Sequence, residues 1–288
     1  MPERMTSQPS RRGEPEPPDP LPIGVVDNHT HLDISREGAP VNLDDLEPVL
    51  RAAAAVGVDR VVQVGCDPVG NDFAVAAAAR YPSVLAGVAV HPNEAPPLAA
   101  RGELEDALAQ VERLAAHPRV RVVGETGLDH FRTGPQGHAV QEESFRRHIE
   151  IAERAGRALQ IHDRDAHEDV LRVLAEEGAP PRTVMHCFSG GPAMARECVR
   201  RGYHLSFSGT VTFKNAKELR DSLAVTPLEL VLVETDAPYL TPHPWRGAAN
   251  SPMLVPLTVR VMASVLGVAV PTLCEALSAN AERLYGPW

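Results

Sequence analysis

Lysine and aromatic residues are scarce in this chain of 288 residues. Phe, Trp and Tyr together make up 4% of it, and the only two lysines are Lys214 and Lys217. The 28 basic residues, nearly all arginine, face 38 acidic ones, which gives a formal net charge of −10 at pH 7. Such a chain has no broad basic surface that could coat nucleic acid without specificity. Any recognition of phosphate must therefore be local, or must rely on metal ions.

Paired cysteines and long apolar runs are also missing. Cys66, Cys187, Cys198 and Cys274 have no CxxC spacing, and a chain of this length holds together without disulfides, so reduced thiols are expected. No run reaches the roughly 18 apolar residues that span a bilayer. The N-terminus has no apolar core typical of a secretory signal. We therefore expect a cytoplasmic protein without membrane contact.

The N-terminal residues differ in composition from the rest of the chain. Residues 1–22 are rich in Pro, Glu, Arg and Ser, which predicts a disordered tail. Residues 23–288 contain no internal boundary signal, so they are expected to form a single domain.

Eight short apolar runs, rich in Val, Ile and Leu, recur after the tail. They occupy residues 23–31, 60–66, 84–92, 121–129, 158–164, 183–190, 203–209 and 229–238. Continuous rather than alternating hydrophobicity is typical of parallel strands that are buried on both faces. The segments between them have helical periodicity, for example 43–57, 103–116 and 140–156, with Gly156 placed to end the last of these.

Eight strand–helix units in about 260 residues predict a single (β/α)8 barrel of the TIM type. The alternative is an open, doubly wound sheet. That fold would need a glycine-rich phosphate loop after the first strand, and the segment DNHTHLD at 27–33 has no glycine. Residues 252–288 are expected to form closing helices.

Residues that can bind metal ions follow the ends of these runs. His29 and His31 form an H-x-H pair on the first run, and both rings can face one side because residues i and i+2 do so in a strand. The later runs contain Glu125, His162, His186 and Asp236, each expected at the C-terminal end of its strand. In a barrel the carboxyl ends of the strands meet at one mouth, so all six are expected to converge there.

This set of side chains suits a pair of divalent ions such as Zn²⁺, Mn²⁺ or Mg²⁺. Glu125 could bridge two ions about 3.5–4 Å apart with its two oxygens, and His162 and His186 would complete the shell of the second ion. Asp236 could bind the first ion and accept a proton from the attacking water. A carbamylated lysine cannot be the bridge on the first six strands, because no lysine precedes Lys214.

The sequence resembles the TatD family of metal-dependent deoxyribonucleases, which belongs to the amidohydrolase-like barrels. The matching segments occur in family order over about residues 23–286: DNHTHLD, VHPNEA, GETGLDHFR, IHDRDA, HCFSGG, SFSGTVTFKNA and ETDAPYLTP. The resemblance implies a barrel with a divalent-metal site formed by the six residues above. It also implies hydrolysis of DNA phosphodiester bonds, in several members as a 3′→5′ exonuclease acting on single strands or 3′ ends.

Three positions depart from the family pattern. Ser251 stands where a glutamate is usual before Pro252, His130 replaces a tyrosine, and Asp163 replaces a serine. None is one of the six expected ligands, so these departures bear on substrate preference. We expect a monomer.

Further residues are candidates for contacts with the substrate. His91 could orient a phosphate or protonate the leaving oxygen. Arg164 and Arg246 are the best candidates for binding phosphate, because a guanidinium donates to it through two N–H groups, and Arg132 is a weaker third. Phe131 and Tyr239 could stack on a terminal base. The other histidines are read as structural (His117, His138, His148, His204) or left open (His130, His167, His243), and Cys187 is expected to pack away from the metals.

Two other functions remain open at this stage. A small-molecule amide, lactone or aminoacyl ester would suit the same centre, and the negative net charge favours it, whereas the two arginines favour DNA. A metal-binding partner protein without activity is disfavoured by the presence of all six ligand types.

Overall fold

The computed structural model describes residues 13–288, so residues 1–12 of the expected tail lie outside the described part. Residues 13–20 contain no helix or strand. Leu21 is buried, and its N–H donates to the Val56 carbonyl at 3.0 Å. Arg260 donates to the carbonyls of Asp19 at 2.9 Å and Pro20 at 3.2 Å. Contacts with the rest of the domain thus begin near Asp19.

Eight parallel strands form one sheet in chain order. They are β1 (Val25–Thr30), β2 (Val58–Val64), β3 (Val84–Val88), β4 (Val120–Asp129), β5 (Ala158–Arg164), β6 (Thr183–Met185), β7 (His204–Phe207) and β8 (Val231–Val233). The sheet closes between β1 and the residues that follow β8: the N–H of Asp236 donates to His29 O at 3.0 Å, and the N–H of His31 donates to Ala237 O at 2.8 Å. The predicted (β/α)8 barrel is confirmed, and the open sheet is wrong.

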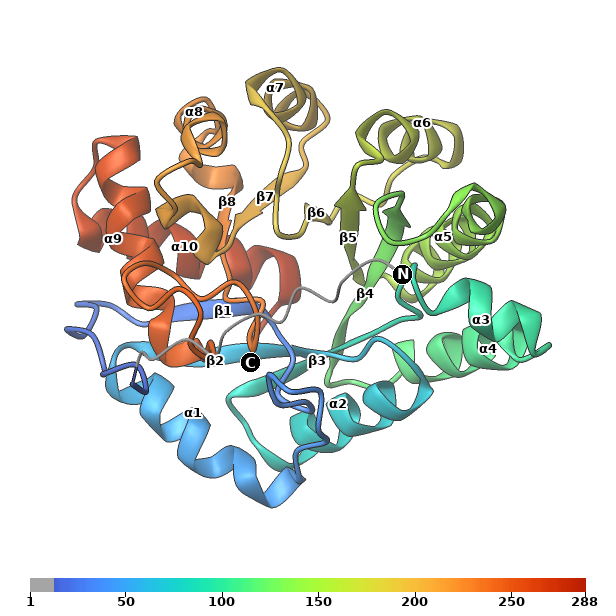
Figure 1. Ribbon diagram of the computed structural model, residues 1–288, viewed down its shortest axis with the longest axis horizontal. Helices are drawn as coiled ribbons and strands as arrows, with labels where there is room; N and C mark the ends of the chain where they lie inside the picture. Colours follow the sequence, from blue (N-terminus) through green and yellow to red (C-terminus); the bar gives the residue numbers. More distant parts are fainter. Residues whose placement is uncertain (1–12) are drawn as a thin grey trace, which may run out of the picture.

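Helices form an outer ring around the strands (Figure 1). The α-helices are α1 (Leu46–Ala55), α2 (Pro68–Arg80), α3 (Ala95–Ala100), α4 (Leu104–Ala115), α5 (Pro135–Ala155), α6 (His167–Glu177), α7 (Pro192–Arg200), α8 (Lys217–Ala224), α9 (Val255–Leu266) and α10 (Val270–Tyr285). Short 3-10 turns are η1 (Leu43–Asp45), η2 (Gly209–Thr212), η3 (Leu228–Leu230) and η4 (Pro252–Leu254). Gly156 ends α5 with φ of 60°, as its position in the sequence predicts.

The apolar core has two parts. The larger part lies between the strands and the surrounding helices. The smaller part joins inward side chains of the strands, such as Val26, Val62 and Leu85, to Leu284 and Tyr285 of α10. Trp288 donates from Nε1 to the carbonyl of Ser83, just before β3, at 2.9 Å. The last helix therefore closes the amino-terminal end of the barrel, and the opposite end is left for a site.

Among residues 13–288, no single helix is long and apolar enough to cross a membrane. Residues Pro252–Leu266 and Val270–Tyr285 meet that criterion only as a pair, by length and composition, and they are bent by 109°.

Candidate metal centre

The structure brings the six expected ligands together at the carboxyl-terminal mouth of the barrel. A cavity of about 1010 Å³ opens there, and its walls include His31, Glu125, His162, His186 and Asp236. His29 is fully buried beneath them. Strands β6 and β8 are shorter than the sequence predicts, because pairing stops at Met185 and Val233. His186 and Asp236 therefore lie on the loops that follow these strands.

His29 and His31 direct the same ring nitrogen at each other. Nδ1 of His29 lies 2.8 Å from the amide oxygen of Gln160, and Nδ1 of His31 lies 2.9 Å from the carbonyl of Val64. Because these oxygens only accept, each Nδ1 carries a proton, and the neutral form of each ring presents the Nε2 lone pair that can bind a metal. The two Nε2 atoms are 3.2 Å apart. Two facing lone pairs cannot hydrogen-bond to each other, and a shared cation would satisfy both.

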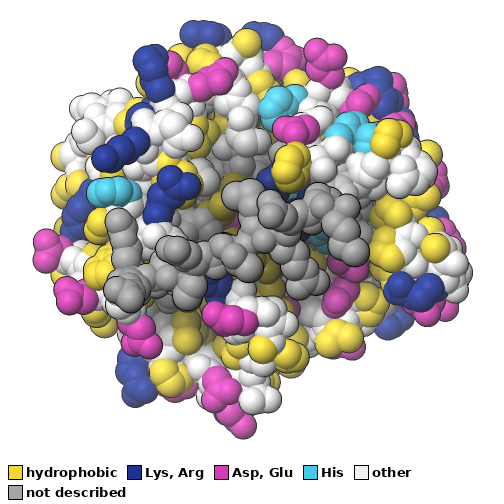
Figure 2. Space-filling model, viewed as in Figure 1, with side chains coloured by type: hydrophobic (Ala, Val, Ile, Leu, Met, Phe, Trp, Pro, Cys, Tyr) yellow, Lys and Arg dark blue, Asp and Glu magenta, His cyan; other side chains and the backbone are white. Residues whose placement is uncertain are grey.

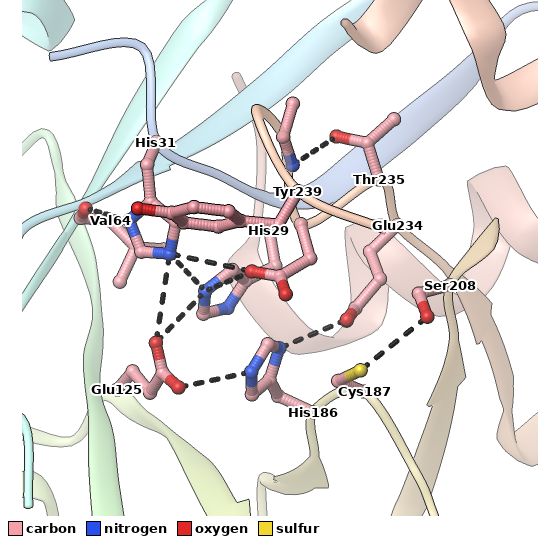
Figure 3. A network of polar contacts seen from close by, with 12 residues as sticks. His29, His31, Val64, Glu125, His186, Cys187, Ser208, Glu234, Thr235 and Tyr239 are labelled. Atoms are coloured by element: carbon pink, nitrogen blue, oxygen red, sulfur yellow. Dashed lines mark hydrogen bonds and ion pairs between the residues drawn. The ribbon is translucent and has the colours of Figure 1, made fainter. Parts of the chain in front are cut away.

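Glu125 contacts two groups of histidines, and Figure 3 shows its contacts with His29, His31 and His186. Its Oε2 is 3.4 Å from Nε2 of His29 and 3.7 Å from Nε2 of His31. Its Oε1 faces the other way, 2.5 Å from Nδ1 of His162 and 3.1 Å from Nε2 of His186. Each carboxylate oxygen thus serves a different pair of imidazoles, which is the arrangement that a bridging ligand requires.

Glu125 lies within β4 rather than at its end. The register of β4 against β5 shifts between Val123 and Thr126, on either side of Glu125. Gly124 and Gly127 flank it with φ of 155° and 136°. A Cβ at Gly124 would lie 2.6 Å from Gln160 O, and one at Gly127 would overlap the carbonyl of His162. Both glycines therefore allow β5 to approach closely where Glu125 turns into the mouth.

His162 and His186 are oriented by acids behind them. Nε2 of His162 lies 3.2 Å from Asp129 Oδ2, and Nδ1 of His186 lies 3.0 Å from Glu234 Oε1. Although burial by itself would lower it, the contacts with Asp129 and Glu125 raise the pKa of His162 to about 9. Carboxylates behind metal-binding imidazoles fix the ring and increase its basicity.

Asp236 faces the first pair of histidines. Its Oδ1 lies 3.5 Å from Nε2 of His31 and 4.0 Å from Nε2 of His29. Burial alone would raise its pKa, but His31 and His186 lower it, so the carboxyl is ionised. The residue has φ of 55°. Asp27, which accepts from the Thr235 N–H at 2.8 Å, ties this loop to β1.

His91 also lies against Glu125, but in a different role. Its Nε2 is 3.4 Å from Glu125 Oε1, and its Nδ1 accepts from the Asn93 N–H at 3.0 Å. Burial lowers the pKa of His91, so the ring is neutral. Nε2 therefore carries the proton and donates. In this form His91 is a hydrogen-bond donor at the edge of the centre. It also belongs, with Glu125 and His162, to a third group whose possible ligand atoms lie within 4.8 Å of one another.

The donor set fits divalent metal ions. His29, His31 and Glu125 offer ligand atoms within 4.8 Å of one another, and so do His29, His186 and Asp236. Burial alone would raise the pKa of Glu125, but the charge of His186 and the hydrogen bond from His162 hold it well below the ordinary range, so the bridge is a carboxylate. Imidazole and carboxylate donors are those that Zn²⁺ and Mn²⁺ accept readily.

Two arginines at the rim rest on phenylalanine rings. The guanidinium carbon of Arg164 lies 4.2 Å from the centre of Phe131, and that of Arg246 lies 4.2 Å from the centre of Phe213. Both arginines line the cavity, as do Arg132 and Tyr239. Phe131 is 62% exposed. The side chains expected to contact the substrate thus lie at the mouth of the barrel.

Several polar residues behind the ligands were not predicted from the sequence. Gln160 fixes His29, Asp129 and Glu234 contact the other pair, and Tyr285 reaches the same network from α10. A signal existed for two of them. Gln160 and Glu234 precede His162 and Asp236 by two positions, which predicts a shared strand face with a ligand. In the structure this holds for Gln160 on β5, whereas Glu234 lies just after β8.

Cys187 lies elsewhere than expected. The sequence indicated packing away from the metals, but Cys187 has φ of 42° and lines the cavity. Its thiol is 3.4 Å from Ser208 Oγ. Burial and the nearby carboxylates of Glu234 and Asp236 hold the pKa of Cys187 well above its ordinary value, so it is a protonated thiol and not a nucleophile.

Two histidines expected to be structural are buried outside the mouth. His148 accepts from the Val90 N–H at 3.0 Å and contacts Ser144 O at 2.7 Å. Burial lowers the pKa of His148 and of His204 to about 4, so both rings are neutral.

The barrel and its His/Glu cluster together define an amidohydrolase-like, metal-dependent hydrolase. Comparison with known proteins agrees. The family model described as TatD related DNase matches residues 26–286. The metal-dependent hydrolase TatD of Mycobacterium tuberculosis is 46% identical over 267 residues, covering 91% of this chain and 98% of that protein. The hydrolase YcfH of Escherichia coli is 38% identical over 264 residues, covering 91% and 95%.

The fold comparison gives the same result. The crystal structure of YJJV, a TatD homologue from Escherichia coli, superposes with a TM-score of 0.82 at 26% identity, covering 91% of this chain and 97% of that one. The chain therefore belongs to the TatD family of metal-dependent hydrolases, as its motifs indicate.

Proposed function

We propose that this protein hydrolyses phosphodiester bonds of DNA at a centre that holds two divalent ions. The observation that carries the proposal is the position of Glu125, whose two oxygens face two different groups of imidazoles. The first group is His29, His31 and Asp236, and the second is His162 and His186. Mg²⁺, Mn²⁺ and Zn²⁺ all suit these donors. Such ions supply Lewis acidity, which activates water and offsets charge on the phosphoryl oxygens.

The protein's own side chains would divide the remaining work. Asp236 is an ionised carboxylate at the mouth, so it can take the proton of the attacking water. His91 presents a protonated Nε2 beside Glu125 and can donate to a phosphoryl oxygen or to the leaving oxygen. Arg164 and Arg246 stack on aromatic faces, which leaves the N–H groups in the guanidinium plane available for the phosphates.

DNA is favoured over a small carbonyl substrate by these arginines and by the family. The description of the family model, TatD related DNase, supports the same choice. The alternative substrate is an amide, lactone or aminoacyl ester, which the net charge of −10 favours. A carbonyl compound without phosphate would give the two rim arginines no role in binding.

The test is hydrolysis of single-stranded DNA by chelated protein, with and without added Mg²⁺, Mn²⁺ or Zn²⁺. We expect no activity after chelation and recovery on adding an ion, with mononucleotides released from the 3′ end of a strand labelled at its 5′ end. Asp236→Asn protein, purified identically, controls for contaminating nucleases. Hydrolysis of esters or lactones, with no cleavage of DNA under any ion, would contradict the proposal.

A further inference from the structure

A second cavity adjoins the mouth. It has a volume of about 540 Å³ and is lined by Phe213, Lys214, His243, Arg246 and Gly247. Phe213, Arg246 and Gly247 also line the cavity over the metal centre. The two cavities therefore lie side by side and share these three residues, which belong to the loops after β7 and β8. We call this second cavity the Lys214 groove.

The groove concentrates cationic groups in an acidic protein. Lys217, the other lysine, is paired with Asp221 on α8 at 2.6 Å. Within residues 13–288, by contrast, no carboxylate lies within ion-pairing distance of Lys214 or Arg246. Within the described part of the chain, no carboxylate thus neutralises their charges. To the left of the centre of the face seen in Figure 2, several basic side chains lie near a histidine.

The walls of the groove are held in place by hydrogen bonds. The N–H of His243 donates to Thr212 Oγ1 at 2.8 Å, which joins the loop after β8 to η2. Arg220 donates to the carbonyl of Phe213 at 2.7 Å and of Val211 at 3.1 Å. The backbone that carries Lys214 is therefore fixed before any ligand binds, which lowers the entropic cost of binding.

We propose that the Lys214 groove binds the phosphates next to the scissile one on a DNA strand. This proposal rests on the proposed function, and it adds a preference for substrates with several phosphates. Arg246, stacked on Phe213, lies where the cavities meet and can donate to one phosphate through its in-plane N–H groups. Lys214 lies farther along and attracts the next phosphate as a point charge. A minimal ester with one phosphate would leave Lys214 without a partner.

The test compares Lys214→Gln with Lys217→Gln, which removes the same charge from a paired and exposed position. Steady-state kinetics on bis(p-nitrophenyl) phosphate and on single-stranded oligonucleotides of two, four and eight residues give KM and kcat separately. For Lys214→Gln we expect KM to rise with strand length, by roughly three- to tenfold more on the longest strand than on the minimal ester. Lys217→Gln should track the wild-type protein on all substrates.

Binding gives a second measurement that needs no catalysis. Fluorescence anisotropy of a labelled octamer with chelated protein, at several salt concentrations, should show weaker binding by Lys214→Gln. The slope of log K against log salt should flatten by about 0.7, the value for one phosphate contact on a single strand. Equal behaviour of the two lysine variants in kinetics and binding would overturn the groove while leaving DNA hydrolysis intact. Failure of the wild-type protein to cleave any oligonucleotide would instead overturn the proposed function.

Discussion

The two ends of the barrel interior are built from the same strands but from opposite kinds of side chain. At the amino-terminal end, inward positions such as Val26, Val62 and Leu85 pack against α10. At the carboxyl-terminal end the ligands His29, His31, Glu125 and His186 are also buried, and the side chains of His162 and Asp236 are 16% exposed. Burial of apolar surface stabilises the first end, whereas buried polar groups at the second are costly unless they are satisfied. Stability and function are thus separated along the barrel axis, as in other barrels of this type.

Burial alone therefore does not mark a functional histidine here. His148, on α5, is as deeply buried as His29, but both of its ring nitrogens are hydrogen-bonded to the backbone, at Val90 and Ser144. Nδ1 of His29 has one partner, the side-chain amide of Gln160, and Nδ1 of His31 has the backbone carbonyl of Val64, while Nε2 of each ring faces another ligand. A lone pair that no donor satisfies distinguishes the metal-binding mouth from the structural shell.

Removing the metal ions should have the largest effect, and only at the mouth. We expect chelation to reduce hydrolysis by at least about 10³-fold, since no other group can activate water, and the secondary structure to remain, because the apolar end needs no metal. Activity measured during back-titration with one divalent ion, alongside circular dichroism, checks both parts. Unfolding on chelation would show that the two ends are not separate.

Asp236→Asn should have the next largest effect. The amide keeps a weak oxygen donor but loses the charge and the ability to take a proton, so kcat should fall by roughly 10²–10⁴. The melting temperature should change little, since Asp236 lies on a loop after β8. Single-turnover rates at saturating metal measure the loss. Activity within a few-fold of wild type would move the role of base to another residue, with His91 the next candidate.

The fold and the ligand set were accessible from the sequence because both follow strand periodicity. Continuous apolar runs marked all eight strands, and all the ligands except Glu125, which lies within β4, fell near or just beyond strand ends. Strand ends were less accessible: β6 and β8 stop at Met185 and Val233, several residues before the apolar runs do. Those next residues, including His186 and Asp236, are directed into the mouth instead of pairing.

Roles that depend on distant partners could not be predicted. The proton on His91 Nε2 follows from the backbone N–H of Asn93, which no spacing rule specifies. Tyr285 lies 125 positions from Gln160, to which it is hydrogen-bonded. Cys187 turns toward the cavity because of its positive φ, a property of the loop that sequence periodicity does not encode.

Leu85→Ala should affect only the apolar end. Leu85 is completely buried within the small interior core, so its truncation should cost about 2–5 kcal/mol of unfolding free energy. Urea denaturation measures this loss. Metal affinity and kcat below the unfolding transition should stay within about twofold of wild type. A parallel loss of metal affinity would mean that packing at one end sets ligand geometry at the other.

Tyr285→Phe tests a chain of hydrogen bonds that connects the two ends. The Tyr285 hydroxyl donates to Asn28 Oδ1 at 2.9 Å and accepts from Gln160 Nε2 at 2.9 Å, and Gln160 fixes His29. Loss of a group that orients a ligand in this way should weaken metal binding by about 10-fold. Tyr81→Phe, which removes a single bond to the Leu43 carbonyl, is the matched control. Competition with a metal-sensitive dye measures the metal affinity of both variants. Equal affinities would contradict a role for Tyr285 in orienting the ligand His29.

Neutralising the rim arginines should have the smallest effect, and it distinguishes DNA from a small substrate. Arg164→Gln and Arg246→Gln leave every ligand in place, so hydrolysis of bis(p-nitrophenyl) phosphate should fall by no more than about threefold. Hydrolysis of an oligonucleotide should fall further, because each lost phosphate contact also flattens the salt dependence by about 0.7 in log K per log salt. The measurement is the ratio of mutant to wild-type kcat/KM on the two substrates, taken at several salt concentrations. Equal losses on both would mean that these arginines support the metal centre itself, and DNA recognition would then have to reside elsewhere along the mouth.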